Sequence, residues 1–429
     1  MLLSESQDNL MTRKLIENIF SLSLLQAVSF ALPLFIVPYL AAILGPELVG
    51  NIAFSVAAIQ IIVTLSDYGF NLTGPRSIAI NRGSRSKVFE IWLSITIVRS
   101  LLSIIGLVII LIISLLSIKV EKNINLIIIC YSMVVGNILY PQWLFQGLEK
   151  LKYITLIQVA SRVLIFILVI SLVQSSKDLL WAAFLQASGL LIGGLLTIPF
   201  LVFEFRGLRV RFPSVKDLIF MLKDGWHAFL SSAAINIYTT SNTFVLGFLV
   251  SSESLGYYSI AEKLIKAICL VYTPITTAIY PHVSRLAIRN KIELFRFDLK
   301  LLLYLTTSAL IIGIILLEFS SPLINYFFDK RYIVLIPLLE RFCFLPLLIL
   351  ISNVIGMLFM FPLGMEGVVS KILSITAFLN FIILILFVHI YGVIGAVSAN
   401  LFIESFVVLM FTYASYKKFY LQYKHQIHC

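Results

Sequence analysis

Long apolar runs separated by short polar connections make up most of the chain between residues 18 and 414. A helix needs about 20 mainly apolar residues to cross the hydrocarbon core of a bilayer. The run LLSIIGLVIILIISLLSI, residues 101–118, is the clearest, whereas the second and the eighth segments are interrupted by polar side chains. The pattern predicts about twelve membrane-spanning helices, with cores near residues 18–42, 51–72, 91–117, 124–145, 153–173, 179–202, 225–250, 256–280, 301–321, 333–361, 371–390 and 394–414.

The composition favours an all-α polytopic membrane protein over a soluble one. Of the 429 residues, 60% are hydrophobic and 12% are charged, and the mean hydropathy is +1.02. A soluble domain carries about 25% charged residues, so this chain has too few to cover a water-facing surface. The four cysteines and five histidines show no metal-binding spacing, and we expect neither a metal nor a cofactor.

The basic residues are distributed unevenly over the connections, and the net charge is +11. One set of alternate connections carries 22 Lys and Arg residues, and the opposite set carries five. Short loops rich in Lys and Arg remain in the cytoplasm, so we predict that both termini are cytoplasmic. Because these residues are scattered rather than massed in one patch, nucleic-acid binding is not expected.

The longest basic connection, residues 203–223, divides the chain into halves of similar length. Ser214 and Asp217 have the spacing of a helix-capping pair, and Leu218, Ile219 and Leu222 then form an apolar stripe. We interpret this segment as a cytoplasmic amphipathic linker lying on the inner leaflet, with an ordinary basic loop as the alternative. The expected architecture is an N-terminal lobe of six spans (1–202), the linker, and a C-terminal lobe of six spans (224–429).

Short similarities recur in the same order in the two halves. The segment LGPELVGNIAF aligns with LVSSESLGYYSI, which places Gly50 opposite Gly256, and further along Gly147 aligns with Gly364. We predict an internal duplication with both halves in the same orientation. Substrate sites of such transporters commonly lie near the bilayer midplane at the interface between the repeats.

Several charged residues fall inside the predicted spans, where each costs about 2.5–3.5 kcal/mol near the bilayer centre. Arg99, Arg162 and Lys266 lie about 15 Å from an end of their helices, near the middle of the hydrocarbon core. Pairing with a neighbouring helix or snorkelling would explain such residues without a ligand, and Glu262 can pair with Lys266 at i,i+4. The surplus of deep positive charge instead favours a central cationic cavity for an anionic substrate such as a phosphate. The candidate substrate-binding residues are Arg99, Arg162, Lys263, Lys266 and Arg341, and the candidates for coupling or gating are Asp67, Glu262 and Glu404.

The sequence lacks the motifs of ATP-driven proteins and of common enzymes. It contains no GxxxxGK[ST] nucleotide-binding loop, no GxSxG nucleophile motif and no connection long enough for a glycosyltransferase domain. We therefore expect a transporter rather than an enzyme, driven by an ion gradient or by the downhill flux of its substrate.

Three segments resemble the bacterial O-antigen flippases (Wzx-type polysaccharide exporters). They are NIFSLSLLQAVSFALPLFIVPYLAAILGPELVGNIAFSVAAIQIIVTLSDYGFNLTGPRSIAINR, YPQWLFQGLEKLKYIT and GYYSIAEKLIKAI. The resemblance covers most of the chain, is clearest over residues 18–100, 137–160 and 240–285, and is faint in the last third. It implies the fold of the multidrug/oligosaccharidyl-lipid/polysaccharide exporter superfamily, in which two six-helix lobes form a V-shaped central cavity.

The resemblance also implies an activity: flipping an undecaprenyl-pyrophosphate-linked O-antigen oligosaccharide from the cytoplasmic to the periplasmic leaflet of the inner membrane, by alternating access, in lipopolysaccharide biosynthesis. Lys263 and Lys266 lie in a matched segment, whereas Arg99, Arg162 and Arg341 are placed by depth alone. The other residues that match recurring family segments are Asp67, Arg76, Gln146, Gly147 and Glu149.

Two other functions remain open at this stage. A cation-coupled multidrug exporter of the same superfamily would need a cavity weighted towards acids and aromatics, which the surplus of deep cations disfavours. A polysaccharide polymerase or ligase usually carries a large periplasmic loop, whereas the outer connections here are short. The expected partners are the lipid-linked oligosaccharide and membrane lipid, with an O-antigen polymerase and a chain-length regulator as further candidates.

Overall fold

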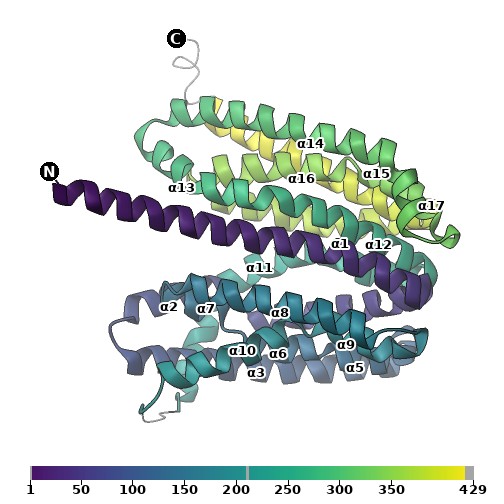
Figure 1. Cartoon of the computed structure of the whole chain (residues 1–429), viewed down its shortest axis with the longest axis horizontal. Helices are drawn as coiled ribbons and strands as arrows, with labels where there is room; N and C mark the ends of the chain where they lie inside the picture. Colours follow the sequence, from purple (N-terminus) through teal and green to yellow (C-terminus); the bar gives the residue numbers. More distant parts are fainter. Residues whose placement is uncertain (1, 209–211, 421–429) are drawn as a thin grey trace. The chain divides into compact units, whose positions relative to one another are not determined.

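The computed structural model describes residues 2–208 and 212–420, and every regular element within them is a helix (Figure 1). The chain divides into two compact units, Met1–Leu32 with Asn51–Thr240 and Pro33–Gly50 with Ser241–Cys429. The lobe boundaries that the sequence suggests, at residues 202/203 and 223/224, remain a prediction. Arg209 and Arg211 of the linker, and Lys424 near the C-terminus, lie outside the described residues.

Two long helices contribute to both units: α1, Leu2–Asp67, and α11, Val215–Leu249. The other elements of the first unit are α2 (Phe70–Asn81), α3 (Arg85–Leu116), α4 (Ile118–Lys122), α5 (Ile124–Cys130), α6 (Ser132–Leu139), α7 (Gln142–Gly147), α8 (Leu151–Leu172), the 3₁₀ turn η1 (Ser176–Asp178), α9 (Leu179–Ala187) and α10 (Gly189–Glu204). Those of the second unit are α12 (Ser252–Cys269), η2 (Leu270–Tyr272), α13 (Thr273–Arg289), α14 (Lys291–Phe327), η3 (Lys330–Tyr332), α15 (Leu335–Phe342), α16 (Leu345–Asn353), η4 (Val354–Met360), α17 (Glu366–Ser415) and η5 (Tyr416–Tyr420).

The apolar helices confirm the all-α polytopic membrane fold. Seven stretches among the described residues are long and apolar enough to cross a membrane, and two bent helix pairs raise the number to nine. Two of the seven, Ala31–Asn81 and Glu366–Lys418, contain a glycine with positive φ, Gly45 (φ 78°) and Gly392 (φ 60°). Positive φ interrupts the helix at each of these glycines, and only glycine adopts such angles at little cost. Each glycine lies between two segments that the apolar pattern predicts as separate spans. The arrangement is compatible with the predicted twelve spans.

A sharp break interrupts the second predicted span before its end. Helix α1 ends at Asp67 and α2 begins at Phe70, and the two residues between them have positive φ, Tyr68 at 45° and Gly69 at 75°. A Cβ on Gly69 would lie 2.7 Å from the backbone carbon of Ala228, so α11 packs directly on this break. The predicted core, residues 51–72, lies in a stretch apolar enough to cross a membrane, but the apolar pattern did not predict the break near its end. The break forms within the family-like segment DYGF.

The capping pair predicted in the linker is confirmed. The Ser214 amide donates to Asp217 Oδ2 at 2.8 Å, and the Asp217 amide donates to Ser214 Oγ at 3.3 Å. Helix α11 starts at this pair and continues without a break through the next predicted span to Leu249. Leu218 and Leu222 pack on a buried cluster of the first unit, whereas Ile219 is exposed. The apolar stripe therefore covers the protein's own core over most of its length.

Gly50 and Gly256, which the sequence comparison aligned, lie against each other within the second unit. A Cβ on Gly50 would lie 1.8 Å from the Ser252 carbonyl oxygen, and a Cβ on Gly256 would lie 1.8 Å from the Pro46 carbonyl oxygen. Each glycine thus lies against the carbonyl of the residue that is four positions before the other glycine in the sequence. This reciprocal contact is what two copies of one motif make when they pack symmetrically, and it supports the predicted duplication.

The motif QWLFQGLEK packs closely against helix α2. A Cβ on Gly147 would lie 2.5 Å from Ile78 Cβ, and one on Gly74 would lie 2.8 Å from the Trp143 ring. An exposed ion pair of 2.7 Å joins Arg82 to Glu149. The family-like residues of this motif therefore hold α7 on α2.

Candidate functional site

Arg99 of α3 is enclosed by polar groups of the first unit. The residue is 1% exposed, and its guanidinium donates to Asp67 Oδ1, to Asn71 Oδ1 at 3.3 Å and to the Asn137 carbonyl at 3.0 Å. Asn71 also donates to Asp67 at 2.8 Å. These contacts join α3 and α6 to both sides of the α1–α2 break, and they leave Arg99 little capacity for a ligand in this conformation.

Arg162 of α8 has a different environment. Its side chain is exposed, it lies near the middle of a 22-residue apolar helix, and no carboxylate among the described residues forms an ion pair with it. The buried Tyr140 hydroxyl interacts with it electrostatically. Five donors in a fixed fork therefore remain available to an anion.

The charged side chains in the second half of α12 are partly paired, as the i,i+4 spacing of Glu262 and Lys266 predicts. Lys266 Nζ lies 2.9 Å from Glu262 Oε1, and Thr243 Oγ1 donates to Glu262 Oε2 at 3.0 Å. Glu262 is 8% exposed, whereas the Lys266 side chain is 47% exposed. Lys263 is half-buried on an adjacent face of the same helix.

The remaining candidates lie on other elements of the second unit. Arg341 is exposed, and its Nη1 donates to the Pro337 carbonyl at 3.2 Å within its own helix. Glu404 of α17 is buried and accepts a hydrogen bond of 2.7 Å from Ser352 of α16. Arg99 therefore pairs with Asp67 in the first unit, and Lys266 pairs with Glu262 in the second. No ion pair joins Arg341 to another candidate among the described residues.

A buried amide network close to Glu262 was not anticipated from the sequence. Asn380 donates to Asn242 at 2.6 Å, Asn242 donates to Asn400, and Asn400 donates to the Tyr258 hydroxyl at 2.8 Å. The Asn380 Oδ1 atom is buried without a partner among the described residues. The available signal was an asparagine inside each of three apolar runs. Glu262 can accept a proton, and its oxygens together with the amide oxygens of this network can coordinate a small cation.

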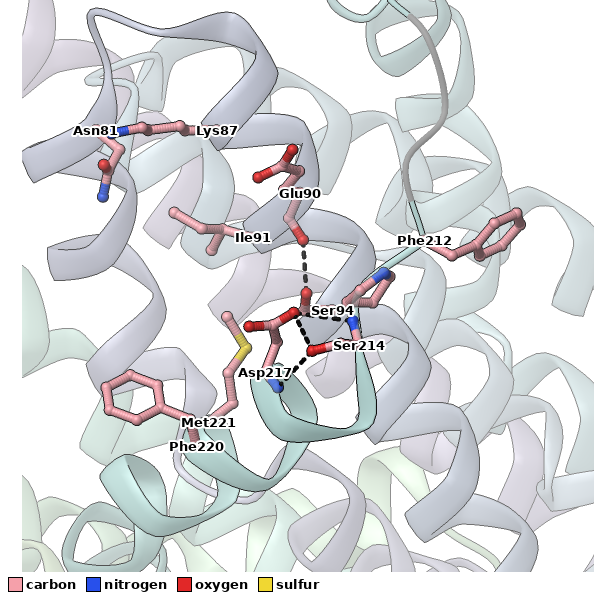
Figure 2. Close-up of a pocket in the computed structure, with 11 residues that line it drawn as sticks. Asn81, Lys87, Glu90, Ile91, Ser94, Phe212, Ser214, Asp217, Phe220 and Met221 are labelled. Atoms are coloured by element: carbon pink, nitrogen blue, oxygen red, sulfur yellow. Dashed lines mark hydrogen bonds between the residues drawn. The ribbon is translucent and has the colours of Figure 1, made fainter.

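A cavity of about 580 Å³ with both polar and apolar lining residues lies between α2, α3 and the start of α11 (Figure 2). Figure 2 shows Lys87 and Glu90 of α3 on one side, and Asp217 held by Ser214 on the other. Two carboxylates against one ammonium give the cavity net negative charge. It can bind hydroxyl groups or cations, and it does not suit a pyrophosphate.

The long apolar helices, with ionisable and amide groups buried between them, are those of a polytopic membrane protein. Its fold is similar to the folds of two solved membrane transporters. An inward-facing multidrug resistance transporter of the MATE family has a TM-score of 0.68 at 15% identity, over 91% of this chain and 96% of that one. The lipid II flippase MurJ has a TM-score of 0.67 at 18% identity, over 91% of this chain and 86% of that one.

The sequence comparisons narrow the class further. Residues 15–287 match the model of the family described as polysaccharide biosynthesis protein, and the chain belongs to that family. A protein of Escherichia coli K12, named provisionally as an O-antigen transporter, is 32% identical over 92% of this chain and 95% of its own length. A Shigella dysenteriae protein with the same name is 30% identical over 92% of this chain and 98% of its own length. The chain is thus a transporter of polysaccharide biosynthesis and not an enzyme.

Proposed function

We propose that this transporter flips an undecaprenyl-pyrophosphate-linked O-antigen oligosaccharide from the cytoplasmic to the periplasmic leaflet of the bacterial inner membrane, by alternating access. Two relatives named as O-antigen transporters align with more than nine-tenths of the chain, and a lipid II flippase shares its fold. Because a multidrug exporter has a similar fold, the fold alone does not identify the substrate. The chemistry of the charged residues must distinguish the two kinds of substrate.

The observation that carries the proposal is that Arg162, an exposed residue in the middle of an apolar helix, forms no ion pair with a carboxylate among the described residues. A charge at that depth is costly unless it meets water or an anion. A guanidinium binds two phosphate oxygens at once through parallel N–H groups, which a lysine cannot do. We assign Arg162 as the first ligand of the pyrophosphate.

The cations of the second unit are secondary candidates for the same anion. Lys266 is exposed but shares its charge with Glu262, so it offers less net attraction than Arg162. Lys263 and Arg341 are retained as candidates from the sequence. Arg99 would have to leave Asp67 before it could bind substrate, and we propose that this pair instead holds the α1–α2 break and acts in gating.

Charge reversal at Arg162 tests the assignment. Arg162→Glu should abolish surface O-antigen in a complementation assay while the membrane level of the protein is unchanged, because the pyrophosphate would meet a carboxylate. Arg162→Lys should retain partial function, since the charge stays and the two-pronged geometry is lost. Lys177→Glu, a reversal in the exposed η1 turn, is the matched control and should behave as wild type.

Accumulation of substrate separates flipping from synthesis. Cells that lack the chain, or carry Arg162→Glu, should accumulate lipid-linked O-units in the cytoplasmic leaflet, measured by access of a membrane-impermeant lectin or oxidant in inverted vesicles. Normal surface polysaccharide in Arg162→Glu cells would remove this residue from the mechanism. Normal polysaccharide in cells lacking the chain would remove the proposed function.

We propose Glu262 as the coupling residue, with Glu404 as the second candidate. Glu262 is buried, receives the Lys266 ammonium and lies on the helix that supplies Tyr258 to the amide network. In proteoliposomes, Glu262→Gln should slow substrate flipping and remove its response to an imposed proton or sodium gradient. The control Glu253→Gln changes an exposed acid in the same helix, and its gradient response should persist.

A cation-coupled multidrug exporter remains the competing function. It predicts that expression of the chain lowers the sensitivity of a drug-susceptible strain to lipophilic cations, independently of O-antigen. An O-antigen polymerase and a chain-length regulator are the proposed protein partners, and crosslinking in the native membrane is the direct test.

A further inference from the structure

A second cavity lies within the second unit, away from the charged residues discussed above. It has a volume of about 250 Å³ and is lined by residues of α14, η4 and the end of α17, and η4 packs against both of these helices. Its wall is mainly apolar, formed by Phe295 and Leu302 of α14 with Ile355 and Phe359 of η4. One carboxylate, Asp298, completes the α14 side.

Asp298 is buried and unpartnered. The residue is 6% exposed, its Oδ1 atom is sealed from solvent, and neither a hydrogen bond nor an ion pair joins its side chain to the rest of the described chain. The neighbouring Ser415 Oγ is buried and unpartnered as well. Arg296 and Lys300 are exposed on other faces of α14 and do not compensate the charge.

A buried carboxylate without a donor is strongly unfavourable, so the cavity calls for a ligand that supplies one. A metal ion fits poorly, because hard cations need about six oxygen ligands and this wall is largely hydrocarbon. An alkylammonium group fits better: it donates hydrogen bonds to Asp298, and the Phe295 and Phe359 rings, 6.0 Å apart, can face its positive charge.

The setting favours a lipid as the source of that ammonium. The cavity is formed at the start of α14 and the end of α17, which the charge distribution assigns to the cytoplasmic side. The exposed Lys417 follows the lining residue Tyr416 in the sequence and can meet a phosphate beside the ammonium. We propose that this cavity binds the head group of an aminophospholipid, with the ammonium on Asp298 and the phosphate on Lys417.

Native mass spectrometry of the purified full-length protein tests the proposal with phosphatidylethanolamine and phosphatidylglycerol at equal concentration. Wild type should retain phosphatidylethanolamine at least about tenfold more strongly, since only this lipid pairs with the carboxylate. Asp298→Asn should lose that preference. The control Glu318→Gln, which removes an exposed acid from the same helix, should keep it.

A second variant covers the case in which Asp298→Asn fails to fold. Leu302→Trp fills the cavity and leaves the carboxylate in place, and it should also lose the preference. n-Octylammonium chloride should displace phosphatidylethanolamine from wild type, whereas n-octanol should not. Equal retention of the two lipids by wild type, a preference that survives Leu302→Trp, or binding of n-octylammonium without phosphatidylethanolamine would each overturn the proposal.

Discussion

Arg99 and Arg162 occupy similar positions in two apolar helices, yet one guanidinium is enclosed and the other is exposed. The difference comes from the neighbouring helices. Arg99 faces the α1–α2 break, where Asp67 and Asn71 accept hydrogen bonds from it, whereas no carboxylate among the described residues forms an ion pair with Arg162, which interacts with the Tyr140 hydroxyl. An intramembrane arginine is therefore a structural element in one helix and an anion receptor candidate in the other.

Breaking the Asp67–Arg99 pair should destabilise the first unit. Removal of one member of a buried ion pair typically costs about 3–5 kcal/mol, because it leaves the other charge without compensation. We expect Asp67→Asn and Arg99→Met each to lower the thermal midpoint in detergent markedly. The double variant should recover much of the loss, since neither charge then remains buried alone.

Transport by the same double variant separates structure from substrate binding. If the Asp67–Arg99 pair only holds the α1–α2 break in place, the double variant should retain measurable flipping in proteoliposomes. A double variant with wild-type stability and no flipping would assign Arg99 a direct role in binding the anion.

At the scale of helices, the contact between α1 and α12 depends on two glycines. Gly50 and Gly256 let the backbones approach until each Cα faces a carbonyl of the other helix. Small residues at such crossings are typical of membrane helices, whose association relies on close packing rather than on the hydrophobic effect. The aligned glycines thus connect a repeat in the sequence with a contact in the fold.

Gly256→Ala should separate this crossing. Its Cβ would lie 1.8 Å from the Pro46 carbonyl oxygen, which is backbone and cannot rotate away. We expect a lower thermal midpoint and loss of O-antigen export. Gly367→Ala is the matched control, because nothing lies within 4 Å of its Cβ, and its effect should stay within about 1 kcal/mol. Wild-type stability of Gly256→Ala would show that the helices tolerate a wider separation.

At the scale of the whole molecule, the basic loops predict the orientation in the membrane. The excess of 22 Lys and Arg residues in one set of connections over five in the other predicts that both termini lie in the cytoplasm. Green fluorescent protein fused after residue 429 should therefore fluoresce, and alkaline phosphatase fused there should be inactive. Alkaline phosphatase inserted after Ser175, beside the η1 turn, should be active. The opposite pattern would mean that every loop lies on the other side of the membrane from the side proposed.

Much of the architecture was predictable because an apolar run that crosses hydrocarbon must satisfy its own backbone hydrogen bonds, which a helix does. The spans, the capping pair at Ser214 and the pairing of Glu262 with Lys266 all follow from local spacing. The break after Asp67 was not predicted, because it depends on Tyr68 and Gly69 adopting positive φ against α11. Asp298 precedes the predicted span core at residues 301–321 and stands between Arg296 and Lys300, so the apolar pattern did not single it out, although it lies on the buried face of α14 with Leu294 and Leu305.

The sequence by itself determined that this chain is a helical membrane protein, which segments are apolar enough to cross a bilayer, and which transporter family it resembles. These properties depend on the polarity and order of residues along one helix at a time. Only the tertiary structure decided which buried charges are neutralised, because Asp67 meets Arg99 and Asn380 meets Asn242 across large separations in the chain. Solvation of an ionic group depends on what surrounds it in space, and that is fixed when the helices pack.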